Sequence, residues 1–271
     1  MNQSSLPGSK ISLVDSHSHL DLPEFNQDRS EVVIRARQNS VNWILCPLDL
    51  CSEESLENGL KLQEENEGIF LAAGVHPHQA NQLNHSHLDR IRNLAIEKKI
   101  LAVGEIGLDF HYNFSSSEKQ LKALRWQLEL ASELRLPVII HSRLAAEKII
   151  ETFQSTGFTG KGILHCFTES LELARFMIEK GFLISFSGIL TYPKAENVRY
   201  LARSLPLENL LIETDAPYLI PYPEKQKYQR NEPAFVVSTA RELARCQNTS
   251  LEKVAEVTKQ NFFRLFNLDY Y

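Results

Sequence analysis

The chain has 271 residues, of which 43% are hydrophobic and 23% charged, and its formal net charge is −5. This balance is typical of a globular protein, and no apolar stretch approaches the length of a membrane span. Met1–Lys10 is polar and predicts no signal peptide. The four cysteines form no CxxC pair and give no disulfide framework, and Cys166, which follows His165 on a strand, is expected to face the opposite side, toward packing. We therefore expect a cytoplasmic protein with no membrane contact, and the sequence indicates no obligate protein partner.

Eight short apolar runs follow one another along the chain at intervals of roughly thirty residues, about the length of one βαβ unit. These predicted strands are Ile11–Val14, Trp43–Cys46, Ile69–Ala73, Ile100–Val103, Pro137–Ile140, Gly162–Leu164, Phe182–Phe186 and Leu210–Ile212. Helices are predicted at Arg29–Gln38, Glu53–Glu65, Leu88–Glu97, Glu118–Leu134, Ala145–Phe153, Leu171–Glu179, Ala195–Ser204, Ala234–Arg245 and Leu251–Leu265. In Glu118–Leu134 the apolar residues recur at steps of three and four, which is typical of an amphipathic helix.

This alternation of strands and helices favours an α/β fold, a (β/α)8 TIM barrel, with residues 1–271 forming one domain. The length of the chain is typical of one such barrel and does not demand a second domain. The rival fold is an open, doubly wound sheet. Nucleotide-binding sheets of that kind carry a glycine-rich turn after the first strand, whereas Asp15–Asp21 contains no glycine.

Six side chains of metal-binding type come directly after predicted strands. They are His17, His19, Glu105, His141, His165 and Asp215. In a closed parallel barrel every strand ends at the same rim, so residues far apart in the sequence converge there. Four histidines and two carboxylates on one rim are the composition of a hydrolytic site that holds two divalent cations.

His17 and His19 are two residues apart on an extended chain, so both side chains point to the same face and can bind one cation. The chain repeats this His-Ser-His pattern at His85 and His87. The second copy follows no apolar run and leads into a predicted helix, where Asn84 or Ser86 can serve as the N-cap. We interpret the first copy as metal ligands and the second as a helix start.

The two carboxylates have distinct expected roles. Glu105 can bridge two cations, which an imidazole cannot do, and the glycines beside it permit a close approach of the backbone. Asp215 closes the ring of ligands onto the first strand, where it can bind a cation and accept the proton of a water molecule. His76, at the end of the third strand, is interpreted as a contact to substrate or water, and the roles of His78 and His111 stay open.

The motifs that carry these residues resemble those of the TatD family of metal-dependent deoxyribonucleases, within the amidohydrolase-like barrels, over nearly the whole chain. They are Asp15–Asp21, Gly74–His78, Gly104–Asp109, Pro137–Arg143, His165–Thr168, Glu213–Pro217 and Arg230–Pro233. The resemblance implies a first cation held by His17, His19, Glu105 and Asp215, and a second held by Glu105, His141 and His165. One departure is Glu169, where the family usually has glycine; it either alters the approach of phosphate or caps the next helix.

The resemblance implies hydrolysis of phosphodiester bonds in DNA, and we expect a 3′–5′ exonuclease acting on single-stranded ends. The acidic chain has no basic cluster of the kind that binds long duplexes. Arg143 and Arg230 are the expected phosphate contacts, since a guanidinium binds phosphate through two hydrogen bonds. Asp215 and Glu105 are the expected catalytic residues, and the cations are expected to be Mg, Mn or Zn. The alternative is a metal-dependent hydrolase of a small amide, lactone or other ester.

Overall fold

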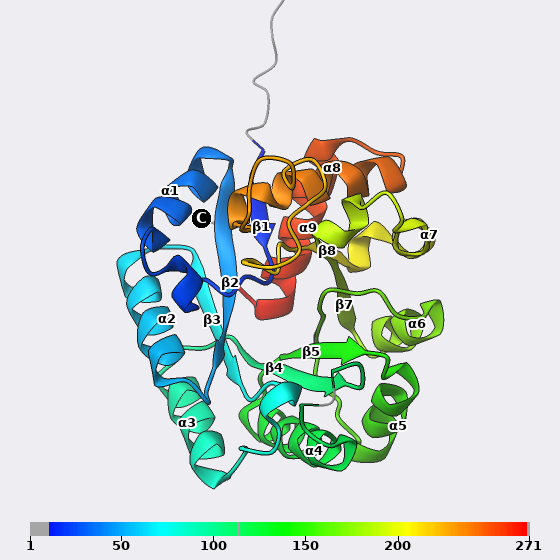
Figure 1. Ribbon diagram of the computed structural model, residues 1–271. Coiled ribbons are helices and arrows are strands. Elements are labelled where there is room, and N and C mark those ends of the chain that lie inside the picture. Colours follow the sequence, from blue (N-terminus) through cyan, green and yellow to red (C-terminus); the bar gives the residue numbers. More distant parts are fainter. Residues whose placement is uncertain (1–10, 113, 270–271) are drawn as a thin grey trace, which may run out of the picture.

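The computed structural model describes residues 11–112 and 114–269, and its eight strands are parallel and paired in chain order around a barrel (Figure 1). The strands are β1 Leu13–Asp15, β2 Val41–Asp49, β3 Ile69–Gly74, β4 Ala102–Asp109, β5 Val138–Arg143, β6 Gly162–Leu164, β7 Phe182–Phe186 and β8 Leu210–Ile212. The helices are α1 Arg29–Gln38, α2 Glu53–Glu65, α3 His85–Ile96, α4 Ser117–Leu134, α5 Ala146–Thr156, α6 Leu171–Glu179, α7 Glu196–Ser204, α8 Val236–Cys246 and α9 Leu251–Phe266. The predicted TIM barrel is confirmed.

All eight predicted strands are present, but β2, β4 and β5 run further than predicted, to Asp49, Asp109 and Arg143. The prediction ended each strand where its apolar run ended. The backbone ladder continues past that point because backbone groups pair whatever the side chain. As a consequence Glu105 and His141 lie within strands rather than after them, which corrects their expected position.

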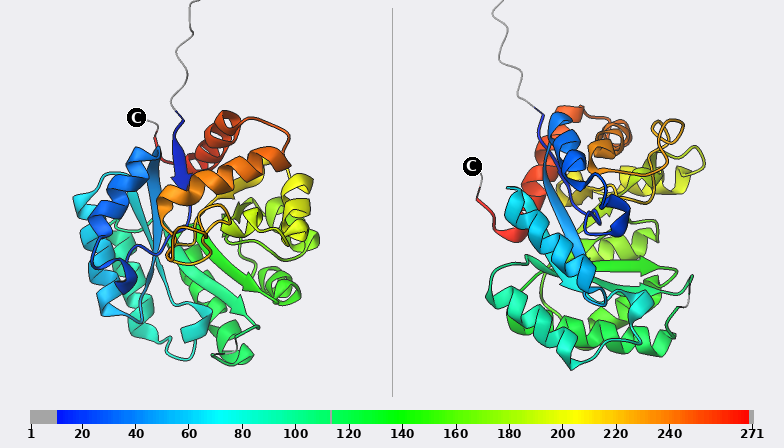
Figure 2. Two further views of the ribbon diagram at one scale, coloured as in Figure 1. Left: turned by 45° about the horizontal axis from the view of Figure 1, so that its top comes forward. Right: turned by 60° about the vertical axis from the view of Figure 1, so that its left-hand side comes forward.

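Two apolar layers hold the barrel together. The inner layer takes one side chain from each strand: Val14, Leu45, Ala72, Ala102, Ile139, Ile163, Leu183 and Leu211. Phe262, Phe263 and Phe266 of α9 pack against this layer, so α9 closes the end of the barrel at which the strands begin (Figure 2). The outer layer lies between the strands and the surrounding helices. Because apolar side chains fill the end at which the strands begin, the polar side chains lie at the other end of the barrel, where the strands finish.

The barrel is closed between β8 and β1 by backbone hydrogen bonds of the segments that follow both strands. The Ser16 amide donates to the Ile212 carbonyl over 3.1 Å, and the Asp215 amide donates to the His17 carbonyl over 2.9 Å. The His19 amide donates to the carbonyl of Ala216 over 2.8 Å. The closing contacts thus include two residues of the first His-Ser-His motif.

A bulge in β4 turns Glu105 into the barrel. Val103 pairs with Val138 and Ile106 pairs with Ile140, so three steps on β4 face two steps on β5. Strict alternation from the inward-facing Ala102 would point Gly104 inward and Glu105 outward. The extra residue lets both face inward, because a bulge places two residues of one strand opposite one of its partner. The Gly104–Glu105 peptide bond within this bulge is cis.

No helix in the described ranges is long and apolar enough to cross a membrane. The polar segment Met1–Lys10, for which the sequence predicts no signal peptide, lies outside the residues that the structure describes.

We expect Gly104→Ala to destabilise the protein. A Cβ atom at position 104 would lie 2.6 Å from the Ile139 Cβ and 3.0 Å from its backbone nitrogen and oxygen. Overpacking of this kind costs about 1–3 kcal/mol. Urea unfolding of the variant should show a lower free energy of unfolding than that of the wild type. An unchanged free energy of unfolding would mean that the bulge accommodates the added Cβ atom without crowding.

Candidate active site

A cavity of about 870 Å³ opens at the end of the barrel where the strands finish. Five of the six predicted ligands line it, namely His19, Glu105, His141, His165 and Asp215. The sixth, His17, is fully buried directly beneath them, with its ring stacked on His165 at a centroid distance of 4.0 Å. The structure therefore brings together all six residues that the sequence singled out.

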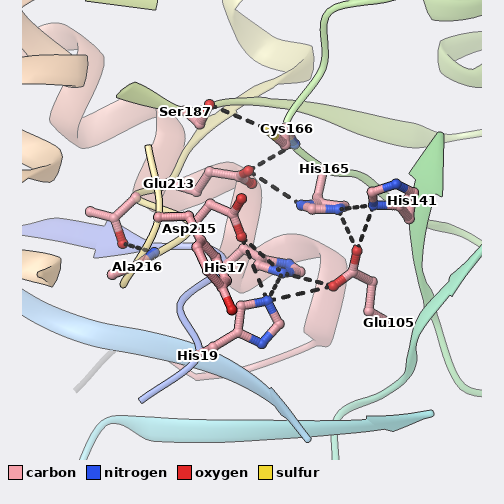
Figure 3. Close-up of polar contacts among 12 residues, drawn as sticks. His17, His19, Glu105, His141, His165, Cys166, Ser187, Glu213, Asp215 and Ala216 are labelled. Carbon is pink, nitrogen blue, oxygen red and sulfur yellow. Dashed lines mark hydrogen bonds and ion pairs between the residues drawn. The ribbon is translucent and has the colours of Figure 1, made fainter. Parts of the chain in front are cut away.

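Glu105 lies at the centre of the site, and its two oxygens face two different groups of histidine nitrogens (Figure 3). Oε1 is 2.8 Å from His141 Nδ1 and 2.7 Å from His165 Nε2. Oε2 is 3.3 Å from His17 Nε2 and 3.6 Å from His19 Nε2. One carboxylate thus stands between two separate nitrogen pairs.

Asp215 completes the group on the Oε2 side. Its Oδ1 is 3.8 Å from His17 Nε2 and 3.6 Å from His19 Nε2. Asp215 follows β8 with a left-handed backbone (φ 56°), and its amide is held by the His17 carbonyl across the barrel seam. Burial alone would raise the pKa of Asp215, but its contact with His19 and the nearby rings of His17 and His165 hold it below its usual value.

His76, which follows β3, lies with His141 and His165 on the Oε1 side of Glu105. Its Nε2 lies 3.3 Å from Glu105 Oε1, close to the His141 ring. Burial lowers the pKa of His76 to about 4, so this ring is neutral near pH 7. The expected contact to substrate or water is compatible with this position. A metal-binding role is compatible as well, because His76, Glu105 and His141 form one of three groups, among the described residues, whose ligand atoms lie within 4.8 Å of one another.

The donor chemistry of these residues fits divalent cations. His17 Nε2 and His19 Nε2 are 3.2 Å apart, as are His141 Nδ1 and His165 Nε2. Two nitrogen lone pairs cannot face each other at that distance without a proton or a cation between them. Burial lowers the pKa of His17 and favours its neutral, ligating form. Mixed imidazole and carboxylate donors suit first-row transition metals such as Zn and Mn.

Two acidic residues that the sequence analysis did not single out hold the histidines from behind. Asp109 Oδ2 lies 2.9 Å from His78 Nε2 and 3.2 Å from His141 Nε2. Glu213 Oε1 lies 3.4 Å from His165 Nδ1 and accepts a hydrogen bond from the Cys166 amide over 2.7 Å. Carboxylates behind ligating histidines fix the orientation and tautomer of the ring. Both residues end or follow strands, β4 and β8, so the argument that found the ligands could have found them too.

The two predicted phosphate contacts are placed differently. Arg143 lines the cavity. Arg230 donates to Asp28 Oδ2 over 2.7 Å, lies over the Phe25 ring and is not among the described residues that line the cavity. The structure thus brings Arg143 to the site and engages Arg230 in a surface ion pair.

The structure tests three local expectations, for the second His-Ser-His copy, for Cys166 and for Glu169. The second His-Ser-His copy is a helix start, as predicted: Asn84 caps α3 in a capping box with His87, and His85 stacks on Trp126. Cys166 was expected to face the packing side, and this was wrong. β6 ends at Leu164, so strand alternation no longer applies, and Cys166 lines the cavity with φ 45°.

Glu169 does not cap the next helix in the chain, which corrects one of its two expected roles. Its Oε1 accepts hydrogen bonds from Ser142 Oγ over 3.0 Å and from the Ala145 amide over 3.1 Å, at the start of α5. The next helix, α6, is capped by Ser170 instead. Glu169 therefore joins the segments after β5 and β6.

The family described as TatD related DNase matches residues 14–267. The chain is 36% identical to the uncharacterized metal-dependent hydrolase YcfH of Escherichia coli (strain K12), over 95% of this chain and 96% of that protein. It is 34% identical to a protein of Rahnella sp. (strain Y9602) named 3′-5′ ssDNA/RNA exonuclease TatD, over 92% and 96% of the two chains. The crystal structure of YJJV, a TatD homolog from Escherichia coli K12, superposes with a TM-score of 0.85 at 30% identity, over 95% and 98% of the two chains.

The barrel, the histidine and carboxylate cluster at its mouth and these likenesses agree with one another. They confirm the expected enzyme class, which is that of the metal-dependent hydrolases. The chain belongs to the TatD family of metal-dependent hydrolases.

Proposed function

We propose that this protein is a metal-dependent 3′–5′ exonuclease that hydrolyses phosphodiester bonds at the ends of single-stranded DNA. The observation that carries the proposal is the position of Glu105, whose two oxygens each face a separate pair of histidine nitrogens on the floor of an open cavity. The name of the Rahnella relative, an exonuclease of single-stranded DNA and RNA, supports the choice of substrate.

The residues would hold two divalent cations, Mg, Mn or Zn. His17, His19 and Asp215 would bind the first together with Glu105 Oε2, and His141 and His165 would bind the second together with Oε1. His76, near Oε1, would contact substrate or water. When bound, a pair of cations neutralises the phosphodiester, lowers the pKa of a water molecule and stabilises the leaving oxygen.

The protein's own groups supply orientation and proton transfer. Asp215 lies at the cavity edge of the cluster and accepts the proton of the attacking water. Arg143, whose exposed guanidinium lies at the cavity, binds the phosphate of the incoming strand. Arg230 was predicted to share this task, but its ion pair with Asp28 would first have to open.

The shape and charge of the protein favour a chain end over a long duplex. The cavity is a pocket in the barrel mouth, so a strand enters it by its terminus. With a formal net charge of −5, the chain offers no excess of positive charge to hold many phosphates at once. The affinity for substrate is therefore expected to come from few phosphates, close to the cations.

The direct test is hydrolysis of a single-stranded oligonucleotide labelled so that removal of its 3′ nucleotide is detected, with the metal content of the protein measured in parallel. We expect activity that EDTA abolishes and added Mn or Mg restores. A metal-loaded protein that leaves oligonucleotides intact and hydrolyses a small amide or lactone would instead establish the alternative function.

Asp215→Asn should lower turnover by roughly 10²–10⁴-fold, the usual contribution of a positioned proton-transfer group, while most of the bound metal is retained. Turnover on the oligonucleotide and metal content are the two measurements. Wild-type turnover in a metal-loaded Asp215→Asn protein would remove Asp215 from the proton-transfer step.

Glu213→Gln should weaken metal binding about 10- to 100-fold, as loss of a carboxylate behind a ligating histidine usually does. Glutamine preserves the size of the side chain and the acceptor for the Cys166 amide, so the fold should survive. Competition with a chromogenic chelator gives the affinity, and Glu208→Gln, an exposed residue just before β8, is the matched control. Equal affinities in both variants would exclude a metal-supporting role for Glu213.

The two His-Ser-His copies provide an internal comparison. His17→Ala should abolish metal-dependent hydrolysis, whereas the double change His85→Ala and His87→Ala should leave it within a few-fold, because these side chains stack on Trp126 and cap α3. Thermal unfolding of both proteins separates loss of function from loss of fold. Similar losses of activity at similar stability would contradict the ligand assignment.

A further inference from the structure

The segment between β4 and α4 presents two large aromatic side chains at the cavity. Tyr112 and Phe114 both line it, and 49% and 66% of their respective surfaces are exposed. Exposure of large aromatic rings is unfavourable in water, and rings that remain exposed beside a functional pocket are typical of binding surfaces. Neither ring is a ligand or a proton-transfer group in the mechanism proposed above.

The two rings are held in a defined arrangement. They are nearly parallel, at 4°, with their centroids 5.5 Å apart. The His78 ring meets both edge-on, at 5.5 Å from Tyr112 and 4.9 Å from Phe114. His78 in turn contacts Asp109, the carboxylate behind His141. A continuous chain of contacts therefore connects the aromatic pair to the cluster around Glu105.

We propose that Phe114 and Tyr112 form a stacking platform for one nucleobase of the strand being hydrolysed. This proposal rests on the proposed nuclease function and adds the subsite that binds the base. The base stacks on the outer face of the ring pair and does not insert between the two rings. An inserted base would need about two stacking steps of roughly 3.4 Å each, which exceeds the 5.5 Å between the centroids.

Arg143 favours a nucleotide over other flat ligands. Its guanidinium carbon lies over the Tyr112 ring, 4.7 Å from the centroid. A positive charge beside an aromatic surface, both at the edge of the cavity, matches a strand that presents phosphates and bases together. With Arg143 over Tyr112, the more exposed Phe114 offers the larger free surface.

The platform would make the enzyme sensitive to base pairing and tolerant of base identity. Every nucleobase has a π face, so stacking discriminates weakly among them, whereas a base inside a duplex is already stacked on both sides. The preference for single-stranded ends would thus arise from a base that must be free to stack, in addition to the shape of the pocket.

The test compares an intact oligonucleotide with oligonucleotides that lack one base at the first, second or third position from the 3′ end. With wild-type protein, one of the abasic substrates should show a KM raised about 5- to 100-fold, the range that corresponds to the loss of one stacked base. Phe114→Leu should raise the KM of the intact substrate by a similar factor and add little to that of the same abasic substrate.

Tyr200→Ala is the matched control, because Tyr200 is 55% exposed on α7 and is not among the described residues that line the cavity. Its KM values should equal those of wild type on every substrate. If Phe114→Leu lowers kcat/KM equally on intact and abasic substrates, or changes neither, the platform does not stack a base and only this inference fails. If the wild-type protein hydrolyses none of the oligonucleotides, the proposed function itself is wrong, and the platform is rejected with it.

Discussion

The rest of the site depends on the buried carboxylate of Glu105. Five histidine nitrogens lie within 3.6 Å of its two oxygens, from His17, His19, His76, His141 and His165. Burial of an isolated carboxylate is strongly unfavourable, so this group is stable only because positive charge or polar hydrogens surround it. Burial favours its protonated form, but the histidine rings, that of His165 foremost, hold the pKa of Glu105 well below its usual value. The charge at the centre and the imidazoles around it therefore stabilise one another.

The same residues connect the site to the closure of the barrel. The strands β1 and β8 are joined through the amides of Ser16, His19 and Asp215, and two of these three residues are proposed ligands. Beneath them, Asp15 accepts hydrogen bonds from the amide and the hydroxyl of Thr214, which lies next to Asp215. The proposed ligands therefore reach their positions only when the last strand is joined to the first.

Much of this arrangement could be predicted from the sequence, because apolar runs and the chemistry of the residues that follow them are local signals. The eight strands, the six convergent side chains and the distinction between the two His-Ser-His copies all follow from such signals. The bulge at Glu105 could not be predicted in this way, because the number of residues that face one another on β4 and β5 depends on both strands. The ion pair of Arg230 with Asp28 was missed for a similar reason, since the two are 202 residues apart. The alternation of side chains between two faces holds only within a strand, so it did not predict the orientation of Cys166, which lies beyond the end of β6.

The aromatic residues of α9 fill the end of the barrel at which the strands begin, and the cavity opens at the other end. A molecule that is split inside such a pocket must leave by the route along which it arrived. Under the proposed exonuclease function, the released nucleotide and the remaining strand would share one opening. Sharing of this kind favours repeated dissociation of the strand over uninterrupted advance along the substrate.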